Sequence, residues 1–346
     1  MADFTIVGGG ITGASVAYHL QKHGHDVTVY DRNDPGKASF ASAGIIAPWI
    51  SQRRNKQWYR LASLGAAYYN TFIKTLELET GLDTGYQQKG VLKLFRNDEI
   101  LAKGYKRISS KLTAAPEMKS VELIDRTHIN RYHPTITEYF PAVFVEGGAQ
   151  VNGAKLNNAL EAGVKHYGGT WLNEDFHPRK ATGEIIYTTG AWGVEQPFKP
   201  DVTHQRAEVF HFEIERDISA QFNPVVMALG PIYIVEMGPN QFAIGTTHED
   251  TTSFSTSPSL DNYKYLKSLA EEYFKGYNIR DIGMNVGLRP NTRDNLPFIG
   301  RIDKETFVIN GMGSTGLTAG PLVGREVARH LSGETTDLHL EDYSYI

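Results

Sequence analysis

The stretch DFTIVGGGITG, residues 3–13, decides the fold of this chain. Its apolar start from Phe4 to Val7 predicts a short strand, and the apolar residues that follow the glycines recur with helical spacing. Gly8 permits a tight turn, Gly10 lets the backbone approach a diphosphate, and Gly13 lets the helix pack close to the strand. A strand, a glycine turn and a helix in this order predict a dinucleotide-binding unit.

An acidic residue follows at the distance that such a unit requires. Residues 26–30 predict a second strand that ends on Asp31, 18 residues after Gly13. This spacing is close to the roughly 20 residues expected for the acid that binds the ribose hydroxyls of adenosine. Its charge would repel a 2′-phosphate, which disfavours NADP. A purely structural glycine turn is the alternative interpretation.

The composition excludes several classes of protein and site. At roughly 150 residues per domain, 346 residues suggest two domains. The absence of cysteine excludes disulfides, zinc–thiolate sites, iron–sulfur clusters and a cysteine nucleophile. A net charge of −4 argues against an extended nucleic-acid footprint. Because Met1-Ala2-Asp3 carries no positive charge and no apolar run approaches the ~18 residues of a membrane span, we expect a cytoplasmic protein.

The glycine and proline positions predict a mixed α/β fold with a discontinuous first domain. Helices are expected at about 58–79, 154–167, 258–277 (with Ser257 as N-cap and Pro258 as first residue) and 317–331. Strands are expected at about 90–95, 141–146, 184–189, 207–214, 232–236, 242–245 and 307–309. Because both ends of the chain read as strand, glycine loop and helix, we expect one domain of residues 1–82, 146–201 and 286–346. Residues 83–145 and 202–285 would form a second, substrate-binding domain on a mixed or antiparallel sheet.

Several ordered motifs carry a family resemblance. They are the N-terminal unit, SFASAGIIAP at 39–48, residues 147–153, residues 189–192, the strand pair 233–247, GLRPNTRDNLPFIG at 287–300 and GMGSTGLTAGP at 311–321. With these motifs the chain resembles, over essentially its whole length, the FAD-dependent amine oxidases that include D-amino-acid oxidase, glycine oxidase and sarcosine oxidase. The resemblance implies a Rossmann-like FAD-binding domain of the glutathione-reductase type.

The resemblance also implies the cofactor and the loops that hold it. We expect non-covalent FAD, because the chain has no cysteine and no histidine near residues 39–44. The implied contact residues are Gly8, Gly10, Ile11, Thr12, Gly13, Asp31, Arg32, Ser39, Ser42, Ala43, Gly44, Gly190, Trp192, Gly313, Ser314, Thr315, Gly316, Leu317 and Thr318. Backbone amides near residues 314–317 would face the negative charge that develops on a reduced flavin.

Arg289 is the first candidate for substrate binding. Its guanidinium offers a planar fork to a carboxylate, and in the resembled family this position anchors the substrate carboxylate. The alternative is an arginine that caps Gly287 or pairs with Asp294. Tyr233 corresponds to an aromatic residue of the substrate wall, with a tyrosine of the sheet core as the alternative, whereas Trp49 is expected in the core. We nominate no protein base, because a flavin accepts a hydride directly from the donor.

Other polar clusters are interpreted as structural or solvated. His19 and His23 have the i,i+4 spacing of metal ligands but lack a third ligand, so no metal site is expected. Residues 248–250, His-Glu-Asp, predict a solvated turn. Residues 53–56, Arg-Arg-Asn-Lys, predict a solvated basic segment, with contact to an anionic lipid or a substrate as the alternative.

Two departures from the resembled family affect what can be carried over. Ser314 stands where glycine oxidases often have an arginine or another polar pocket residue, so their substrate preference does not transfer. Only 18 residues separate Trp171 from Gly190, where members of the resembled family have a longer segment with additional strands. We expect a short segment around Phe176 to cover the adenine of the cofactor in its place.

The resulting hypothesis is an FAD-dependent oxidase of a D-amino acid, glycine or sarcosine that reduces oxygen to hydrogen peroxide. A quinone as electron acceptor and a homo-oligomer remain open. The alternatives are a 2-hydroxy-acid oxidase or dehydrogenase on the same scaffold, and a flavin- or nucleotide-binding protein without turnover.

Overall fold

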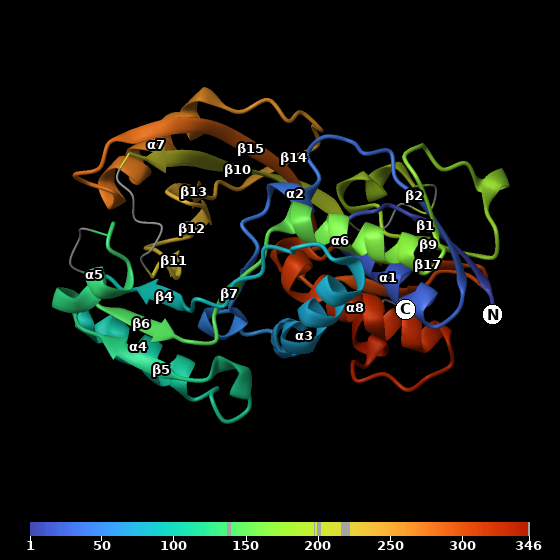
Figure 1. Ribbon diagram of the computed structural model, residues 1–346, viewed down its shortest axis with the longest axis horizontal. Coiled ribbons are helices and arrows are strands. Elements are labelled where there is room, and N and C mark those ends of the chain that lie inside the picture. Colours follow the sequence, from blue (N-terminus) through green and yellow to red (C-terminus); the bar gives the residue numbers. More distant parts are fainter. Residues whose placement is uncertain (137–139, 197, 199–201, 216–221, 345–346) are drawn as a thin grey trace.

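The computed structural model describes residues 1–344 apart from 137–139, 197, 199–201 and 216–221 (Figure 1). Its helices are α1 (Ile11–Lys22), α2 (Ala38–Ala41), α3 (Lys56–Thr80), α4 (Asp98–Ser109), α5 (Ile129–Tyr132), α6 (Gly153–His166), α7 (Leu260–Tyr273) and α8 (Gly316–Leu331). Its strands are β1 (Asp3–Val7), β2 (Asp26–Tyr30), β3 (Ile45–Ile46), β4 (Val91–Leu94), β5 (Val121–Ile124), β6 (Ala142–Val145), β7 (Ala149–Gln150), β8 (Thr170–Leu172), β9 (Glu184–Tyr187), β10 (Thr203–Ile214), β11 (Val225–Met227), β12 (Tyr233–Gly238), β13 (Gln241–Gly245), β14 (Glu249–Thr251), β15 (Ile279–Asn291), β16 (Phe298–Arg301) and β17 (Thr306–Asn310).

Within the described residues, six strands form the first sheet, in the order β16-β17-β9-β1-β2-β8. The pairs from β17 to β8 are parallel, and only β16 pairs antiparallel with its neighbour. Helix α1 contacts β1 and β2 and also packs against α6 and α8, which α3 contacts in turn (Figure 1). The close approach of α1 and α8 depends on Gly324, where a Cβ atom would lie 2.4 Å from the Cβ atom of Ser15. This arrangement brings α1 and α8, from the two ends of the chain, together beside the first sheet.

The second sheet is mixed but mostly antiparallel. In the part of the chain that the structure describes it has nine strands, in the order β14-β10-β13-β12-β11-β4-β6-β5, with β15 paired along β10. The β4–β11 pair is parallel, whereas the long β10–β15 pair is antiparallel and carries a register shift between His211 and Phe212. Helix α7 packs on β10 and β13, and a separate hydrophobic cluster that includes Phe212, Phe242 and Phe274 fills the space between them.

The predicted helices and strands lie close to their observed positions, with one clear correction. The helix expected from Ser257 begins at Leu260, because the Ser259 side chain caps it by accepting from the Asn262 amide. It also ends at Tyr273 instead of Tyr277. Pro258 therefore precedes the N-cap and is not the first helical residue. The sequence patterns also did not identify α4, β5 or the long strand β15.

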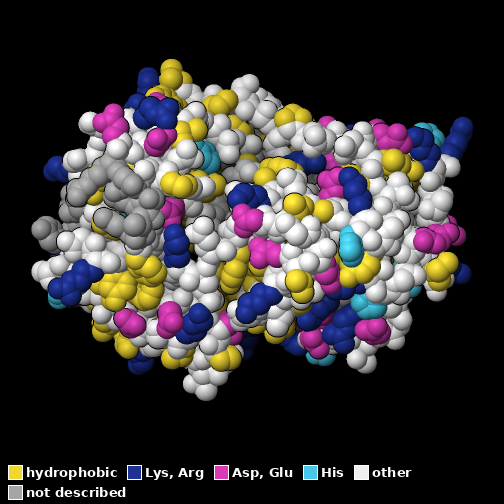
Figure 2. Space-filling model, viewed as in Figure 1, with side chains coloured by type: hydrophobic (Ala, Val, Ile, Leu, Met, Phe, Trp, Pro, Cys, Tyr) yellow, Lys and Arg dark blue, Asp and Glu magenta, His cyan; other side chains and the backbone are white. Residues whose placement is uncertain are grey.

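Charged side chains of both signs are mixed on the visible surface (Figure 2). On the face shown in Figure 2, Lys and Arg side chains are interspersed with Asp and Glu, and no large area carries a single sign. Among the helices of the described residues, none is long and apolar enough to cross a membrane.

His19 is buried, and its ring lies 3.1 Å from the Tyr68 hydroxyl. No group of three His, Cys, Asp or Glu residues in the described chain could hold a metal ion.

Candidate active site

A cavity of about 610 Å³ is lined by residues of both sheets. Its walls come from the loops after β1 and β2, from residues 37–53, from β10, β12 and β15, and from the loop before α8. All of the predicted site residues line it except Gly13. Gly13 acts in packing instead, because a Cβ atom there would lie 1.9 Å from the Gly8 carbonyl oxygen.

The glycine turn after β1 and the Asp31 side chain form one end of the cavity, called here its first end. Gly8 has a φ of +104° and a Cβ atom there would lie 2.6 Å from the Thr188 carbonyl oxygen, so the turn requires glycine. The Asp31 carboxylate is buried and accepts hydrogen bonds from the amides of Gly9, at 2.6 Å, and Asn33, at 2.6 Å. It also pairs with Lys37 at 2.8 Å. Asp31 thereby fixes the turn at the point where the predicted cofactor would meet it.

Several predicted residues at this end make contacts with neighbouring side chains. Arg32 pairs with Asp34 at 2.6 Å and with Glu195 at 2.8 Å. Trp192 stacks on Phe254 with ring centroids 5.8 Å apart, and Gly190 accepts a hydrogen bond from Asn310 at 3.0 Å. Phe176 lines the cavity and packs against Tyr30 and Tyr187, which is the position expected for the shortened 171–190 segment.

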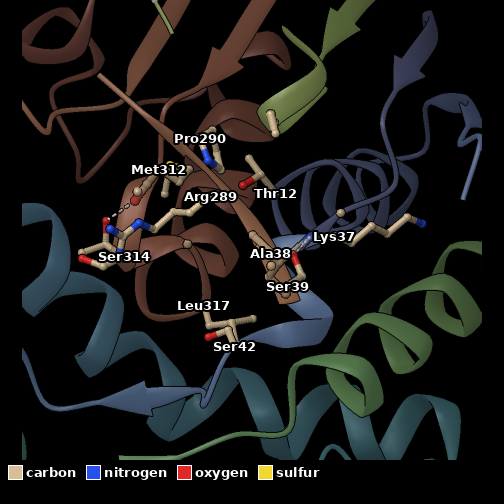
Figure 3. Close-up of a pocket in the computed structure, with 18 of the residues that line it drawn as sticks. Thr12, Lys37, Ala38, Ser39, Ser42, Arg289, Pro290, Met312, Ser314 and Leu317 are labelled. Atoms are coloured by element: carbon tan, nitrogen blue, oxygen red, sulfur yellow. Dashed lines mark hydrogen bonds between the residues drawn. The ribbon is translucent and has the colours of Figure 1, made fainter. Parts of the chain in front are cut away.

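The loop of residues 39–44 is held in place by close backbone contacts. The Ser39 hydroxyl accepts from the Ile11 amide at 3.1 Å. A Cβ atom at Gly44, where φ is +69°, would lie 1.8 Å from the Val151 carbonyl oxygen, and one at Gly153 would lie 1.9 Å from that of Ser39. Ser39, Ser42, Ala43 and Gly44 all line the cavity. Figure 3 shows Ser39 and Ser42, and the close contacts of Ser39 and Gly44 are with Gly153 and Val151, at and just before the start of α6.

The C-terminal glycine loop forms the opposite wall. The Thr315 hydroxyl donates to the Met312 carbonyl at 2.6 Å, and that of Thr318 donates to the Ile45 carbonyl at 3.2 Å. Helix α8 starts at Gly316 and has no acidic residue in its first turn. Its positive dipole end therefore faces the cavity without a compensating charge.

Arg289 and Tyr233 lie at the other end of the cavity. Arg289 is on β15, and its guanidinium donates to the Gln205 side chain, whose amide donates to Asp250 at 2.7 Å. Its Nε atom is buried and has no hydrogen-bond partner among the described residues. Burial, and then the charge of Arg53, lower the pKa of Arg289. Burial also raises the pKa of Tyr233, whose hydroxyl stays protonated.

Two residues of this end were not predicted. Residues 248–250 are exposed as expected, but Glu249 and Asp250 form the start of strand β14 and not a turn. His248 lines the cavity, and its Nε2 lies 3.1 Å from Arg289. Because arginine can only donate, this Nε2 is an acceptor and the ring is neutral. Partial burial, Arg289 and Arg53 all lower the pKa of His248, which agrees with the neutral form.

Arg53 is the second unpredicted residue. Arg53, Arg54 and Lys56 are all exposed, as a solvated segment requires, but only Arg53 of these three lines the cavity, which corresponds to the alternative of a substrate contact. Arg53 lines the cavity mouth, donates to the Ser314 hydroxyl at 3.4 Å, and lies over the Trp58 ring at 4.8 Å. No local signal distinguishes Arg53 from Arg54, because only the packing of α3 against α8 decides which of them reaches the cavity.

Comparison with known proteins identifies the family. The family model of the FAD-dependent oxidoreductases known as DAO matches residues 3–330. The chain belongs to this family. It is 33% identical to YurR of Bacillus subtilis (strain 168), described as an uncharacterized oxidoreductase, over 99% of this chain and 98% of the relative.

Two solved structures are similar to this DAO-family chain. Iminodiacetate oxidase of Chelativorans sp. BNC1 has a TM-score of 0.92 and 28% identity over 99% of this chain and 98% of its own. Glycine oxidase of Geobacillus kaustophilus has a TM-score of 0.86 and 22% identity over 100% of this chain and 99% of its own, which supports the fold. As a member of the family, the chain is an FAD-dependent oxidoreductase.

The first end of the cavity fits FAD. Gly8 and Gly10 present no side chain to the cavity, and α1 begins after Gly10 without a side-chain cap or an acidic residue in its first turn. Such a helix start holds a diphosphate through its amides and dipole. Asp31 would supply the carboxylate for the ribose hydroxyls of a bound FAD, and the absence of cysteine excludes a cysteinyl link to the flavin.

Proposed function

We propose that this chain oxidises the C–N bond of a small amino acid or secondary amine, such as glycine, sarcosine or a D-amino acid. Arg289 carries this proposal, because it is a half-buried cation with an unpartnered Nε and no carboxylate within ion-pair distance among the described residues. An anionic donor would complete its hydrogen bonds. The glycine oxidase and iminodiacetate oxidase that resemble this chain act, by their names, on amines with carboxylates.

The residues around Arg289 would orient such a donor. Gln205 and His248 hold the guanidinium from two sides, which limits its rotation. The Tyr233 ring gives the wall an apolar face and a hydroxyl. FAD, when bound, takes up the hydride that leaves the donor α-carbon. No protein base is assigned, and the α8 dipole would favour negative charge at its own end of the cavity.

We also propose non-covalent FAD and a division of the chain into two units. Residues 1–82, 146–201 and 286–346 contain every strand of the first sheet, which supports their assignment to the cofactor unit. Residues 83–145 and 202–285 contain the strands of the second sheet, except that β15 runs across the boundary at residue 285. The predicted cavity residues would hold FAD at the first sheet and the donor at the second.

A peroxide assay tests the proposed activity. The purified flavoprotein is incubated in air with glycine, sarcosine and a panel of D-amino acids, and hydrogen peroxide is followed. Peroxide formation with at least one amine is expected. Reduction of the flavin without peroxide would indicate a quinone or another acceptor. Reduction by 2-hydroxy acids but by none of the amines would contradict the proposal.

A further inference from the structure

The charged residues that line the cavity are distributed unevenly between its two ends. Arg32 and Lys37 are paired with acidic residues at one end, whereas the cations of the other end have no lining acid among the described residues. The acidic lining residues, which all belong to the end near β2 and β8, are Asp31, Asp34, Glu174, Asp175 and Glu195. The end near Tyr233 is lined by Arg53, Lys93 and Arg289, together with His248, and by no Asp or Glu of the described chain. Lys93 belongs to this end because β4 pairs Lys93 with Met227, which in turn lies opposite Tyr233. The donor end is therefore strongly cationic.

Arg53 and Arg289 form the centre of this positive region. Both side chains approach Ser314. Arg53 donates to the Ser314 hydroxyl. The Arg289 side chain extends toward Ser314 and away from Thr12 and Ser39 (Figure 3). The two guanidinium groups are near enough for the charge of Arg53 to lower the pKa of Arg289. Two like charges at one cavity mouth repel each other, and a bound anion removes this repulsion.

A single carboxylate does not account for both arginines. Arg289 alone offers the planar fork that one carboxylate needs. Arg53 is oriented by the Trp58 ring and by Ser314 and has no ion-pair partner among the described residues. It therefore presents a second site for an anion at the same mouth.

We propose that Arg53 binds a second carboxylate of the donor, so that the preferred substrates are amino acids or secondary amines with two carboxylates. This inference rests on the proposed amine oxidation. The second carboxylate could be attached to the nitrogen substituent or to the side chain, and both would place a second negative charge beside Arg53. Arg289 then binds the carboxylate that all donors share, and Arg53 determines the preference for donors with a second carboxylate.

Matched donor pairs test the inference on the holoenzyme. Sarcosine and iminodiacetate differ only by the carboxylate on the nitrogen substituent, and D-alanine and D-aspartate differ by the carboxylate on the side chain. We expect kcat/KM to be about tenfold or more higher for the dicarboxylate in at least one pair, mainly through KM. The pair that shows the preference identifies where the second carboxylate is attached.

Variants of neighbouring arginines provide the control. Arg53→Met should reduce the preference for the dicarboxylate by about tenfold, and Arg53→Lys should restore part of it because the charge is retained. Arg54→Met is the matched control, since Arg54 is exposed and does not line the cavity. A preference that Arg53→Met leaves intact, or a wild-type protein that favours the monocarboxylates, would overturn the inference while the proposed amine oxidation stands.

A binding measurement covers the case in which no amine is oxidised. Succinate and acetate are titrated into the holoenzyme, and the shift of the flavin absorption spectrum is recorded. Tighter binding of succinate that is lost in Arg53→Met but not in Arg54→Met would support the second anion site even though the proposed activity had failed. Equal affinity for succinate and acetate in the wild-type protein would reject it.

Discussion

At the scale of single residues, the chemistry of the donor end depends on Arg289. Gln205 and His248 hold its guanidinium, while its Nε stays buried without a partner in the described chain. Arg289 was predicted because a guanidinium suits a carboxylate and because the motif at 287–300 resembles the family's carboxylate-anchoring segment. Arg53 and His248 could not be predicted in the same way, since long-range packing alone brings them to Arg289.

Substitution of Arg289 tests its role directly. In Arg289→Met the donor carboxylate would be left unpaired, which costs about 2–5 kcal/mol and should lower kcat/KM by about 30-fold or more. Arg289→Lys should recover only part of the loss, because an ammonium cannot form the bidentate contact. Steady-state kinetics measure both variants, and an unaltered flavin spectrum shows that the cofactor site is intact. A KM that stays at the wild-type value would disprove carboxylate binding by Arg289.

At the scale of elements, the cofactor end depends on a turn that tolerates no additional atom. The strand, turn and helix from β1 to α1 were predictable because each signal is local. The start of α7 was misplaced because Ser257-Pro258 and Ser259 offer competing caps, and only the bond from Asn262 to Ser259 decides between them. The sequence patterns missed β15, whose pairing with β10 is a long-range contact.

Gly13→Ala tests the turn. Its Cβ atom would lie 1.9 Å from the Gly8 carbonyl oxygen and 2.3 Å from the Thr188 hydroxyl, so the turn must move. We expect a flavin content well below that of the wild-type protein and a loss of stability of about 1–3 kcal/mol. Gly238→Ala is the control, because the nearest atom to a Cβ there is 3.5 Å away. Full flavin content in Gly13→Ala, measured by the ratio of flavin to protein absorbance, would show that the turn is less constrained than described.

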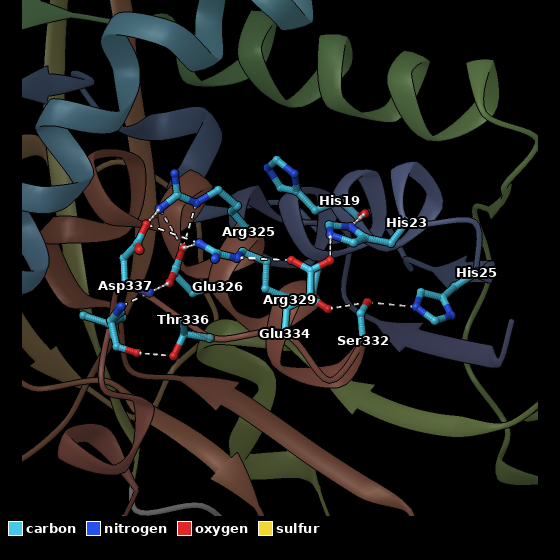
Figure 4. Close-up of polar contacts among 12 residues, drawn as sticks. His19, His23, His25, Arg325, Glu326, Arg329, Ser332, Glu334, Thr336 and Asp337 are labelled. Atoms are coloured by element: carbon cyan, nitrogen blue, oxygen red, sulfur yellow. Dashed lines mark hydrogen bonds and ion pairs between the residues drawn. The ribbon is translucent and has the colours of Figure 1, made fainter.

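At the scale of the whole molecule, a network of charges joins α8 to the C-terminal segment (Figure 4). Glu326 is fully buried, pairs with Arg325 at 2.7 Å and accepts hydrogen bonds from the amides of Asp337 and Leu338. Arg329 lies 3.4 Å from the exposed Glu334, and Glu334 lies 3.3 Å from His23, the C-cap of α1. The network thus connects the two helices that flank the cofactor turn.

Removal of the buried carboxylate should destabilise the protein globally. Glu326→Ala leaves the amides of Asp337 and Leu338 without their acceptor and removes the buried partner of Arg325 and Arg329, which keep only Asp337 and Glu334 of the described residues as ion-pair partners, so we expect a loss of about 3 kcal/mol. Glu334→Gln changes an exposed partner and should cost less than about 1 kcal/mol. Denaturant unfolding of both holoproteins provides the comparison. Equal losses in the two variants would mean that burial of Glu326 contributes nothing.

Two buried histidines should make stability depend on pH. Burial lowers the pKa of His19 and of His133 to about 3, below the ordinary value of 6.5. Because the unfolded chain then binds more protons than the folded one, stability falls as the pH drops from about 6.5 toward 3, by about 1.4 kcal/mol per pH unit for each histidine. His133→Gln should make this dependence less steep, whereas the same change at the exposed His128 should not. An unchanged slope in His133→Gln, from unfolding curves at several pH values, would contradict the assignment.

The central claim is that the donor is an amine whose electrons pass to FAD in the cavity beside Arg289. Its most direct test is the visible spectrum of the purified protein, recorded without air before and after addition of glycine, sarcosine, iminodiacetate and D-amino acids. The account predicts a flavin spectrum that loses its visible absorption band with at least one of these amines, and that loses it about 30-fold more slowly or not at all in Arg289→Met at the same donor concentration. A protein that carries flavin but retains the band with every amine, or one that is reduced equally well without Arg289, would contradict it.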